Sequence, residues 1–341
     1  MSTPLAPRSS APVPVSTDAT PTRAIGLILL GMVLLSGNDV LFKQMSGDYP
    51  LHQLVFTRSA IGLGVASVVL WQQGGLVLLQ TRRPVLHLVR ALLIVLANML
   101  YFAALVAMPL GVATALFFVA PLFITVLAIP VLGERVGKHR LTALLIGFAG
   151  VVVMVLPQGA RSEDWADVPR AALLLPIAAA ACYAGMQVMT RKLGEASSAV
   201  AMTIYIQVAF LVVSGLFYLV AGDGRFVDAA QGESMTFLLR AWVWPAPEDI
   251  WKFAVLGGIA AAVGLCLAQA YRIGNAATVA SFEYVALPIA IVAGWLVFGE
   301  RPGWVLLAGS ALIALAGLYV FARERARPGD GPAAGRPIRR G

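Results

Sequence analysis

Three ionisable residues lie inside long apolar stretches of this sequence: Asp39, Arg58 and Glu283. An ionised side chain within a membrane-spanning helix costs about 2.5–3.5 kcal/mol on insertion scales, so such residues are rare and need a partner or water. A planar guanidinium such as that of Arg58 suits carboxylates and flat heterocycles. These three residues are therefore the first candidates for binding a solute.

Asp39 and Arg58 are predicted at compatible depths, because Arg58 lies about six residues, or roughly 9–10 Å, into its helix. One hypothesis is that the two side chains meet and bind or gate a solute. The alternative is a structural ion pair between two helices. Lys43 can also reach Asp39, because it lies four residues further along the same helix.

Glu283 is predicted at a different depth, about 10 Å from the other end of its helix. It can bind a cation or carry a coupling proton, and its neighbours Phe282 and Tyr284 can stack on a ring. The alternative is a buried acid that hydrogen-bonds a neighbouring helix. Asp39 is the second candidate for coupling.

Neutral polar residues recur in the same apolar stretches, and in lipid they should face protein or a cavity. Four of them join the candidate solute-binding set: Asn98, Tyr101, Gln187 and Gln269. Interhelical hydrogen bonding is the alternative for each residue taken alone.

The elements that position these residues must be membrane helices. Of the 341 residues, 59% are hydrophobic and 12% are charged, against roughly 45–50% and about 25% in soluble domains. The mean hydropathy is +0.83. These values exclude a soluble enzyme domain, a disordered chain and a disulfide scaffold. The net charge of +8 fits basic loops on one side of a bilayer, so we expect no nucleic-acid partner.

Ten apolar runs approach the roughly 20 residues that one helix needs to cross a bilayer core of about 30 Å. They cover about 25–43, 52–71, 87–107, 112–132, 140–157, 171–190, 199–220, 252–272, 277–298 and 303–322. The predicted fold class is an all-α membrane protein with ten transmembrane helices. Residues 1–23 and 323–341 have the composition of disordered tails, the second of them basic.

The two halves of the chain share a pattern. The matching segments are Ala113-Thr114 with Gly133-Glu134-Arg135, and Ala277-Thr278 with Gly299-Glu300-Arg301. Five spans per half is an odd number, so the second half enters the membrane from the opposite side. The sequence therefore predicts two inverted five-helix repeats, 24–158 and 170–322, with a substrate site at their interface. A duplication retained only for packing is the alternative.

Most of the 25 lysine and arginine residues, Arg90 among them, fall on one side if the N-terminus is placed inside the cell. This bias predicts that both termini are cytoplasmic. Three tryptophans in the long loop near 221–251 indicate an aromatic belt at the opposite surface.

Prolines and small residues add two further expectations. Pro121, Pro130 and Pro288 are predicted to interrupt the fourth and ninth spans, as in transporters with broken helices. Small residues spaced four apart, such as Gly257 and Ala261, permit close helix contacts and also a homodimer.

The duplicated five-span unit resembles the drug/metabolite transporter superfamily, in its EamA-type branch, over residues 24–322. The more specific stretches are Gly37-Asn38-Asp39-Val40-Leu41-Phe42-Lys43, Leu54-Val55-Phe56-Thr57-Arg58 and Ser281-Phe282-Glu283-Tyr284. They resemble a bacterial subgroup that includes uptake proteins for S-adenosylmethionine and riboflavin. The resemblance implies a secondary transporter of a small organic metabolite in a bacterial-type cytoplasmic (inner) membrane.

Several kinds of chemistry have no motif in the sequence. There is no Walker loop for ATP, no zinc spacing among the three histidines, and no nucleophile elbow. We therefore expect no cofactor, no metal and no catalytic residue. The alternatives to a transporter are a membrane-embedded enzyme and a non-transporting sensor or assembly protein.

Overall fold

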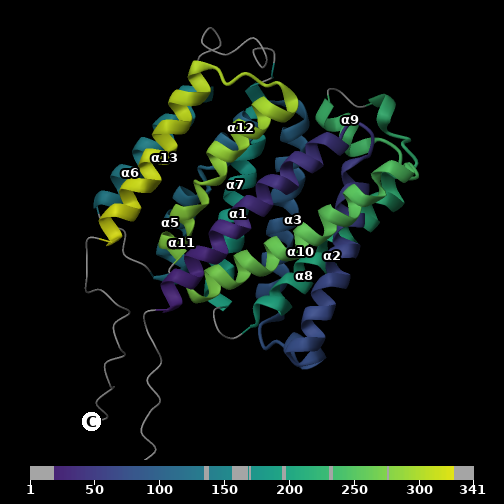
Figure 1. Ribbon diagram of the computed structural model, residues 1–341, viewed down its shortest axis with the longest axis horizontal. Coiled ribbons are helices and arrows are strands. Elements are labelled where there is room, and N and C mark those ends of the chain that lie inside the picture. The colour runs from purple at the N-terminus through teal and green to yellow at the C-terminus, as the bar shows by residue number, and fades with distance from the viewer. Residues whose placement is uncertain are drawn as a thin grey trace, which may run out of the picture.

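The computed structural model describes residues 19–133, 138–155, 168, 170–193, 197–229, 233–274 and 276–325, and all regular structure among them is helical (Figure 1). The α-helices are α1 (Ala19–Met45), α2 (Leu51–Gln73), α3 (Pro84–Ala107), α4 (Leu110–Phe117), α5 (Ala120–Leu132), α6 (Lys138–Val155), α7 (Arg170–Leu193), α8 (Ala199–Ala221), α9 (Glu233–Leu239), α10 (Ile250–Ile273), α11 (Ala276–Glu283), α12 (Ala286–Phe298) and α13 (Trp304–Arg325). Three short 3₁₀ turns are η1 (Gly75–Leu79), η4 (Val227–Ala229) and η5 (Pro247–Asp249).

Seven helical stretches of the described chain have the length and hydropathy of a membrane span, with α4 and α5 taken together as Leu110–Leu132. The all-helical class is therefore confirmed. The predicted spans 140–157, 277–298 and 303–322 also overlap helices, but the described residues of these helices do not meet the same criteria. The number of ten spans stays a prediction.

The first and last helices extend a few residues into the predicted tails. Helix α1 begins at Ala19, inside the predicted tail 1–23, and α13 continues to Arg325, inside the predicted tail 323–341. The remainder of both tails lies outside the described residues. Glu134 of the first repeat motif also lies outside them.

The fourth and ninth predicted spans are each divided into two helices. Helix α4 ends at Phe117 and α5 begins at Ala120, with Pro121 in its first turn. Helices α11 and α12 are divided in the same way, just before Pro288. Proline has no backbone N–H and fits the first turn of a helix, which explains where each second helix begins. The interruptions at Pro121 and Pro288 are confirmed, whereas α5 continues through Pro130.

Several helices that occupy the same order in the two halves match in length, although α1 and α7 have 27 and 24 residues and α6 and α13 have 18 and 22. Helices α2 and α8 have 23 residues each, and α3 and α10 have 24. The broken pairs have 8 and 13 residues in both halves, and each ends at a glycine with positive φ, 72° at Gly133 and 70° at Gly299. These lengths pair Leu110 with Ala276. The sequence match of Ala113 with Ala277 is therefore displaced by two residues.

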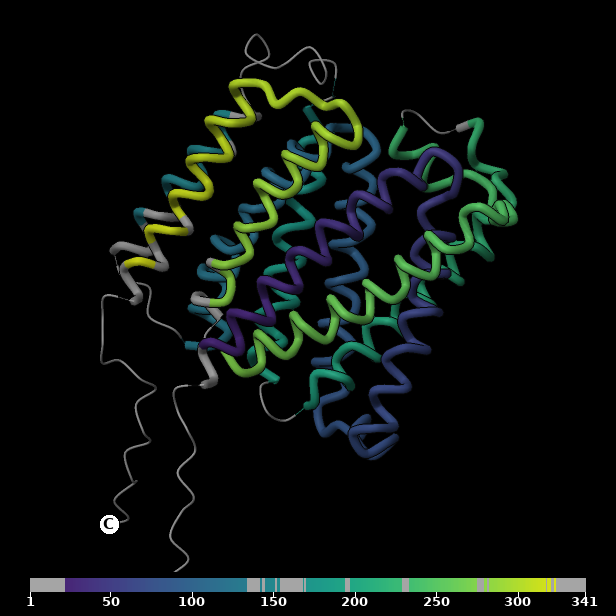
Figure 2. Tube along the Cα trace, in the orientation of Figure 1, coloured from purple at the N-terminus to yellow at the C-terminus, as the bar shows by residue number. Residues whose placement is uncertain are grey.

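Helices from different halves lie side by side. Helix α3 packs along α7, α1 along α10, α2 along α8, and α6 along α13, as the tube in Figure 2 shows. Helix α10 approaches α2 closely at Gly257, where an added Cβ would lie 2.5 Å from Cβ of Ile61 and 3.0 Å from the backbone oxygen of Arg58. Its small residues thus serve packing within the chain, as their spacing permits.

The segment between α8 and α10 covers the turn between α1 and α2. The Tyr49 hydroxyl donates to Asp249 at 2.7 Å, and Gln53 exchanges two hydrogen bonds with the backbone of Val243, at 2.5 and 3.1 Å. Arg240 donates to the backbone oxygen of Tyr49 at 3.2 Å. The long loop is therefore fastened to the first helical hairpin.

The three tryptophans of this region differ in their surroundings. Trp244 is 94% exposed and Trp251 is 57% exposed, which suits an aromatic belt at a membrane surface. Trp242 instead packs edge-on against His52 and Phe56 at ring-centroid distances of 5.9 and 5.5 Å. Trp242 therefore packs the loop against α2 rather than facing the membrane surface.

Candidate functional site

A cavity of about 160 Å³ lies at the centre of the helices. Its walls come from both halves of the chain: α1, α2, α3 and α4 from the first, and α7, α8, α10, α11 and α12 from the second. Six of the sequence-predicted candidates line it: Asp39, Arg58, Asn98, Tyr101, Gln187 and Glu283. Residues far apart in the sequence are thus brought to one cavity.

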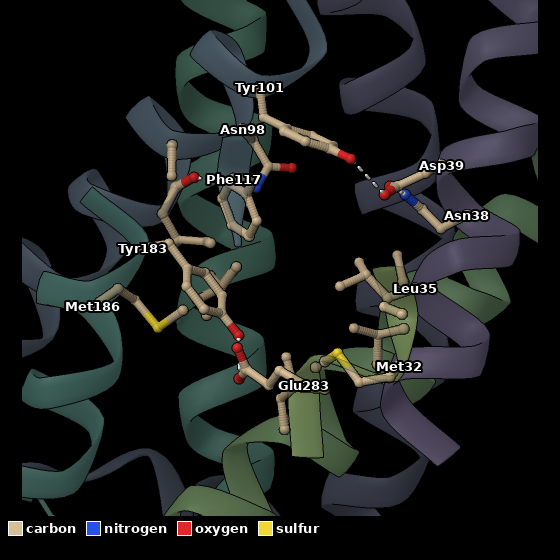
Figure 3. A pocket seen from close by; sticks show the side chains of 18 of the residues that line it. Met32, Leu35, Asn38, Asp39, Asn98, Tyr101, Phe117, Tyr183, Met186 and Glu283 are labelled. Carbon is tan, nitrogen blue, oxygen red and sulfur yellow. Dashed lines mark hydrogen bonds between the residues drawn. The ribbon is translucent and has the colours of Figure 1, made fainter. Parts of the chain in front are cut away.

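One end of the cavity is organised around Asp39. Its carboxylate accepts hydrogen bonds from Asn38 Nδ2 at 3.1 Å and from the Tyr101 hydroxyl at 3.0 Å. The Tyr101 hydroxyl also lies 3.1 Å from Thr114 Oγ1 at the start of the broken helix pair. Figure 3 shows the phenol of Tyr101 pointing from α3 toward Asp39 on α1. Burial makes such hydrogen bonds necessary for the carboxylate, which is 7% exposed.

Arg58 lies at the same end but does not pair with Asp39. Its Nη2 donates to Asn98 Oδ1 at 2.6 Å, and its Nη1 makes a long contact of 3.4 Å to Asn38 Oδ1. Its guanidinium carbon also lies 5.2–5.5 Å from the centroids of three phenylalanine rings, those of Phe42, Phe102 and Phe210. Within the described chain there is no direct ion pair between Asp39 and Arg58. Asn38 contacts both and links them.

Lys43 does not reach back to Asp39 either, contrary to the sequence-based alternative. Its Nζ donates to Glu300 Oε1 at 2.5 Å and to the backbone oxygen of Met108 at 2.9 Å. The other oxygen of Glu300 accepts from the backbone N–H of Leu110, the first residue of α4, at 2.8 Å. A negative charge is favourable at a helix N-terminus, so Glu300 suits both partners. The first half is thereby tied to the second.

Glu283 forms a second polar cluster away from Asp39. Its Oε1 accepts from the hydroxyls of Tyr183 at 2.9 Å and Tyr271 at 2.6 Å. Gln187 Nε2 in turn donates to the Tyr183 hydroxyl at 2.6 Å. Figure 3 shows Glu283 and Asp39 at different ends of the cavity. The intervening wall includes apolar Met32 and Leu35.

Three sequence-predicted candidates do not line the cavity. Gln269 accepts a hydrogen bond from Nε of the neighbouring Arg272 at 3.2 Å. Phe282 packs against the buried apolar core. The Tyr284 ring packs on Phe118, with centroids 5.7 Å apart. The residues beside Glu283 thus point elsewhere, because neighbours on a helix are separated by about 100°.

One charged residue of the cavity was not among the sequence-predicted candidates. Arg90 was assigned to a basic loop side, yet it lies on α3, is 2% exposed and lines the cavity. Arg90 lies near the start of an apolar run, and long side chains at helix ends usually reach water. The sequence therefore contained no indication that this side chain is buried. No group of three or more His, Cys, Asp or Glu side chains in the described chain has the arrangement of a metal site.

The sequence comparisons decide the family. The model of the EamA-like transporter family matches residues 22–156. A riboflavin transporter of Rhizobium johnstonii is 30% identical over 275 residues, which cover 77% of this chain and 82% of that protein. The chain belongs to the EamA-like transporter family.

Other transporters match over comparable lengths. A riboflavin transporter of Vibrio cholerae is 28% identical and covers 87% of this chain and 92% of its own. An S-adenosylmethionine uptake transporter of Rickettsia prowazekii is 26% identical, and the match covers 90% of this chain and 96% of that protein. A solved crystal structure matches this chain with a TM-score of 0.66 at 20% sequence identity. The match covers 90% of this chain and 99% of that chain, and it supports the fold.

Membership has two consequences. This EamA-like protein is a multi-pass membrane protein with bacterial relatives, and a transporter of small metabolites rather than an enzyme. The alternative of a membrane-embedded enzyme is thereby removed. The resemblance to the drug/metabolite transporter superfamily and to the riboflavin and S-adenosylmethionine subgroup is confirmed.

Proposed function

We propose that this protein is a secondary transporter that moves a small organic metabolite across the inner membrane by alternating access. The observation that carries the proposal is the central cavity, whose buried charged groups come from both halves of the chain. A site between two structural repeats, near the middle of the helices, is the usual place for the solute of a secondary transporter. A cavity within a rigid, single-repeat bundle would not be exposed alternately to two sides.

Two inverted five-helix repeats, 24–158 and 170–322, account for the matched helix lengths. They also account for the exchange of packing partners, because α3 with α7 and α1 with α10 are corresponding pairs in opposite order. Under this proposal each broken pair, α4–α5 and α11–α12, lines the pathway where its backbone is interrupted. The ten-span count follows if α6, α12 and α13 complete the two units.

We place both termini in the cytoplasm. Helix α1 begins and α13 ends at the same side of the molecule in Figure 1. Arg82 and Arg83 precede α3, and Arg191 and Lys192 lie in the last turn of α7, where Arg83 contacts the backbone oxygen of Lys192 at 3.5 Å. The excess of lysine and arginine in cytoplasmic loops supports this orientation.

The proposed solute has a flat ring and mixed polarity. Aromatic and polar side chains line the cavity together, and relatives are named as transporters of riboflavin and of S-adenosylmethionine. In this proposal Asp39, Arg58, Asn98 and Tyr101 bind one part of the solute. Gln187 and Glu283 bind another part, and Glu283 or Asp39 carries a coupling proton. A homodimer remains a prediction of the sequence alone.

A thermal-shift screen of the detergent-purified protein tests the proposal. The panel contains riboflavin, S-adenosylmethionine, nucleosides, amino acids and cationic dyes. A ligand at 100 times its dissociation constant stabilises the folded state by about 2.7 kcal/mol. We expect at least one ring-bearing compound to stabilise the protein, and Arg58→Ala to weaken that effect. A panel without any stabilising compound, followed by no accumulation or depletion of metabolites in overexpressing cells, would refute the proposed function.

A further inference from the structure

Arg90 is a second buried guanidinium in the wall of the cavity. Its Nε donates to Thr190 Oγ1 on α7 at 2.6 Å, and its Nη1 donates to the backbone oxygen of Met202 on α8 at 3.1 Å. The side chain is among the largest fully buried ones of the described chain. It therefore lies where α3, α7 and α8 meet at the cavity.

No acid compensates this charge. Within the residues that the structure describes, no ion pair involves Arg90, and no hydrogen bond reaches its Nη2. A guanidinium has five N–H donors, and two are used, so three remain. A buried cation without an anion is costly, which favours binding of an anion from outside the protein.

The two arginines of the cavity differ in this respect. Arg58 is surrounded by three phenylalanine rings and shares Asn38 with the carboxylate of Asp39. Arg90 has only a hydroxyl and a carbonyl oxygen. Its partner Thr190 lies seven residues, or about 10 Å, along α7 from Tyr183, which holds Glu283. An anion bound at Arg90 is therefore not placed against Glu283.

We propose that Arg90 binds an anionic group of the solute, a carboxylate or a phosphate, between α3, α7 and α8. The planar guanidinium can form two parallel hydrogen bonds with either group, and this geometry gives both affinity and orientation. The inference rests on the proposed function and narrows its solute to compounds that carry an anionic group beside the ring.

The test uses two matched pairs of compounds with the purified full-length protein. S-adenosylmethionine is compared with its decarboxylated form, and riboflavin 5′-phosphate with riboflavin, by thermal-shift titration. We expect the anionic member of one pair to bind at least about tenfold more tightly, a difference of about 1.4 kcal/mol. In Arg90→Gln we expect the ratio of the two dissociation constants, neutral member to anionic member, to fall to about one, because the charge is lost. The pair that shows the preference distinguishes carboxylate from phosphate.

A control variant separates loss of the Arg90 guanidinium from loss of positive charge near α3. Arg83→Gln removes an exposed arginine just before α3, outside the cavity wall. We expect it to keep the anion preference. If Arg90→Gln does not fold, Arg90→Lys decides, because it keeps the charge without the planar fork. With Arg90→Lys we expect the ratio to fall by at least about threefold.

The outcomes are distinct. If either ring binds to the wild type with no preference for the anionic member, the proposal for Arg90 is overturned and the proposed function stands. The same holds if the preference persists in Arg90→Gln or is unchanged in Arg90→Lys. If no member of either pair binds, the proposed ring-bearing solute fails, and the inference fails with it.

Discussion

The tie between Lys43 and Glu300 gives the sharpest prediction about how the two halves are held together. Glu300 follows α12 and accepts hydrogen bonds from Lys43 on α1 and from the backbone of Leu110 on α4. The two side chains are only 15% and 16% exposed. The perturbation is Glu300→Gln, which keeps an oxygen for Leu110 but removes the negative charge opposite Lys43.

The expected cost follows from this geometry. Charge-assisted hydrogen bonds contribute about 1.5–3 kcal/mol each, and loss of one partner of a buried ion pair costs about 3–5 kcal/mol. Lys43 keeps its hydrogen bond to the Met108 carbonyl, and residual solvent exposure screens its charge. We therefore expect Glu300→Gln to lower the free energy of unfolding by about 1.5–3 kcal/mol.

A double-mutant cycle measures the interaction itself. Lys43→Met, Glu300→Gln and the double variant are compared by reversible denaturation in detergent. We expect a coupling free energy of at least about 1 kcal/mol. Asp223→Asn is the matched control, because the Arg225–Asp223 pair is more than half exposed, and no measurable change is expected. Additive single substitutions would refute the reasoning.

Three further predictions concern the cavity and its walls. Arg58→Lys is expected to weaken solute binding at least about tenfold, because an ammonium cannot reproduce a planar, stacked guanidinium; near-normal transport would argue against that form of recognition. Glu283→Gln is expected to abolish the pH dependence of uptake into proteoliposomes, and full transport at every pH tested would exclude its proton role. Gly257→Ala is expected to lower thermal stability by about 1–3 kcal/mol, since its Cβ meets Ile61 and backbone. Gly258→Ala, with nothing within 4 Å, is the control, and equal stability of the two variants would contradict the packing argument.

The helices were largely predictable because membrane spans need long apolar runs, and lipid allows few other solutions. The broken spans were predictable in part, since proline fixes the start of a helix. Pro121 and Pro288 mark breaks, whereas Pro130 does not. A proline gives a local restraint, and packing of the surrounding helix decides whether the helix ends there.

The contacts within the site were less predictable. Asp39 lies four residues from Lys43 in the sequence, and Glu300 lies 257 residues away. Lys43 pairs with Glu300, the acid that is distant in the sequence. Spacing along a helix identifies only partners that are close in the sequence. Arg90 was assigned to the loops for the same reason, since its burial depends on α7 and α8 rather than on its own neighbours.

The segment between α8 and α10 has no counterpart of similar length between α2 and α3. Three residues of this segment, Arg240, Val243 and Asp249, form hydrogen bonds with Tyr49 and Gln53, at the turn between α1 and α2 and in the first turn of α2. A motion that lifts this segment from the turn has to break these bonds together, so opening there is cooperative and not gradual. In the proposed alternating-access cycle, we therefore expect opening on this side to be slower than opening on the other side. Shortening the segment between α8 and α10 is then expected to change the rate of transport more than the affinity of the cavity for its solute.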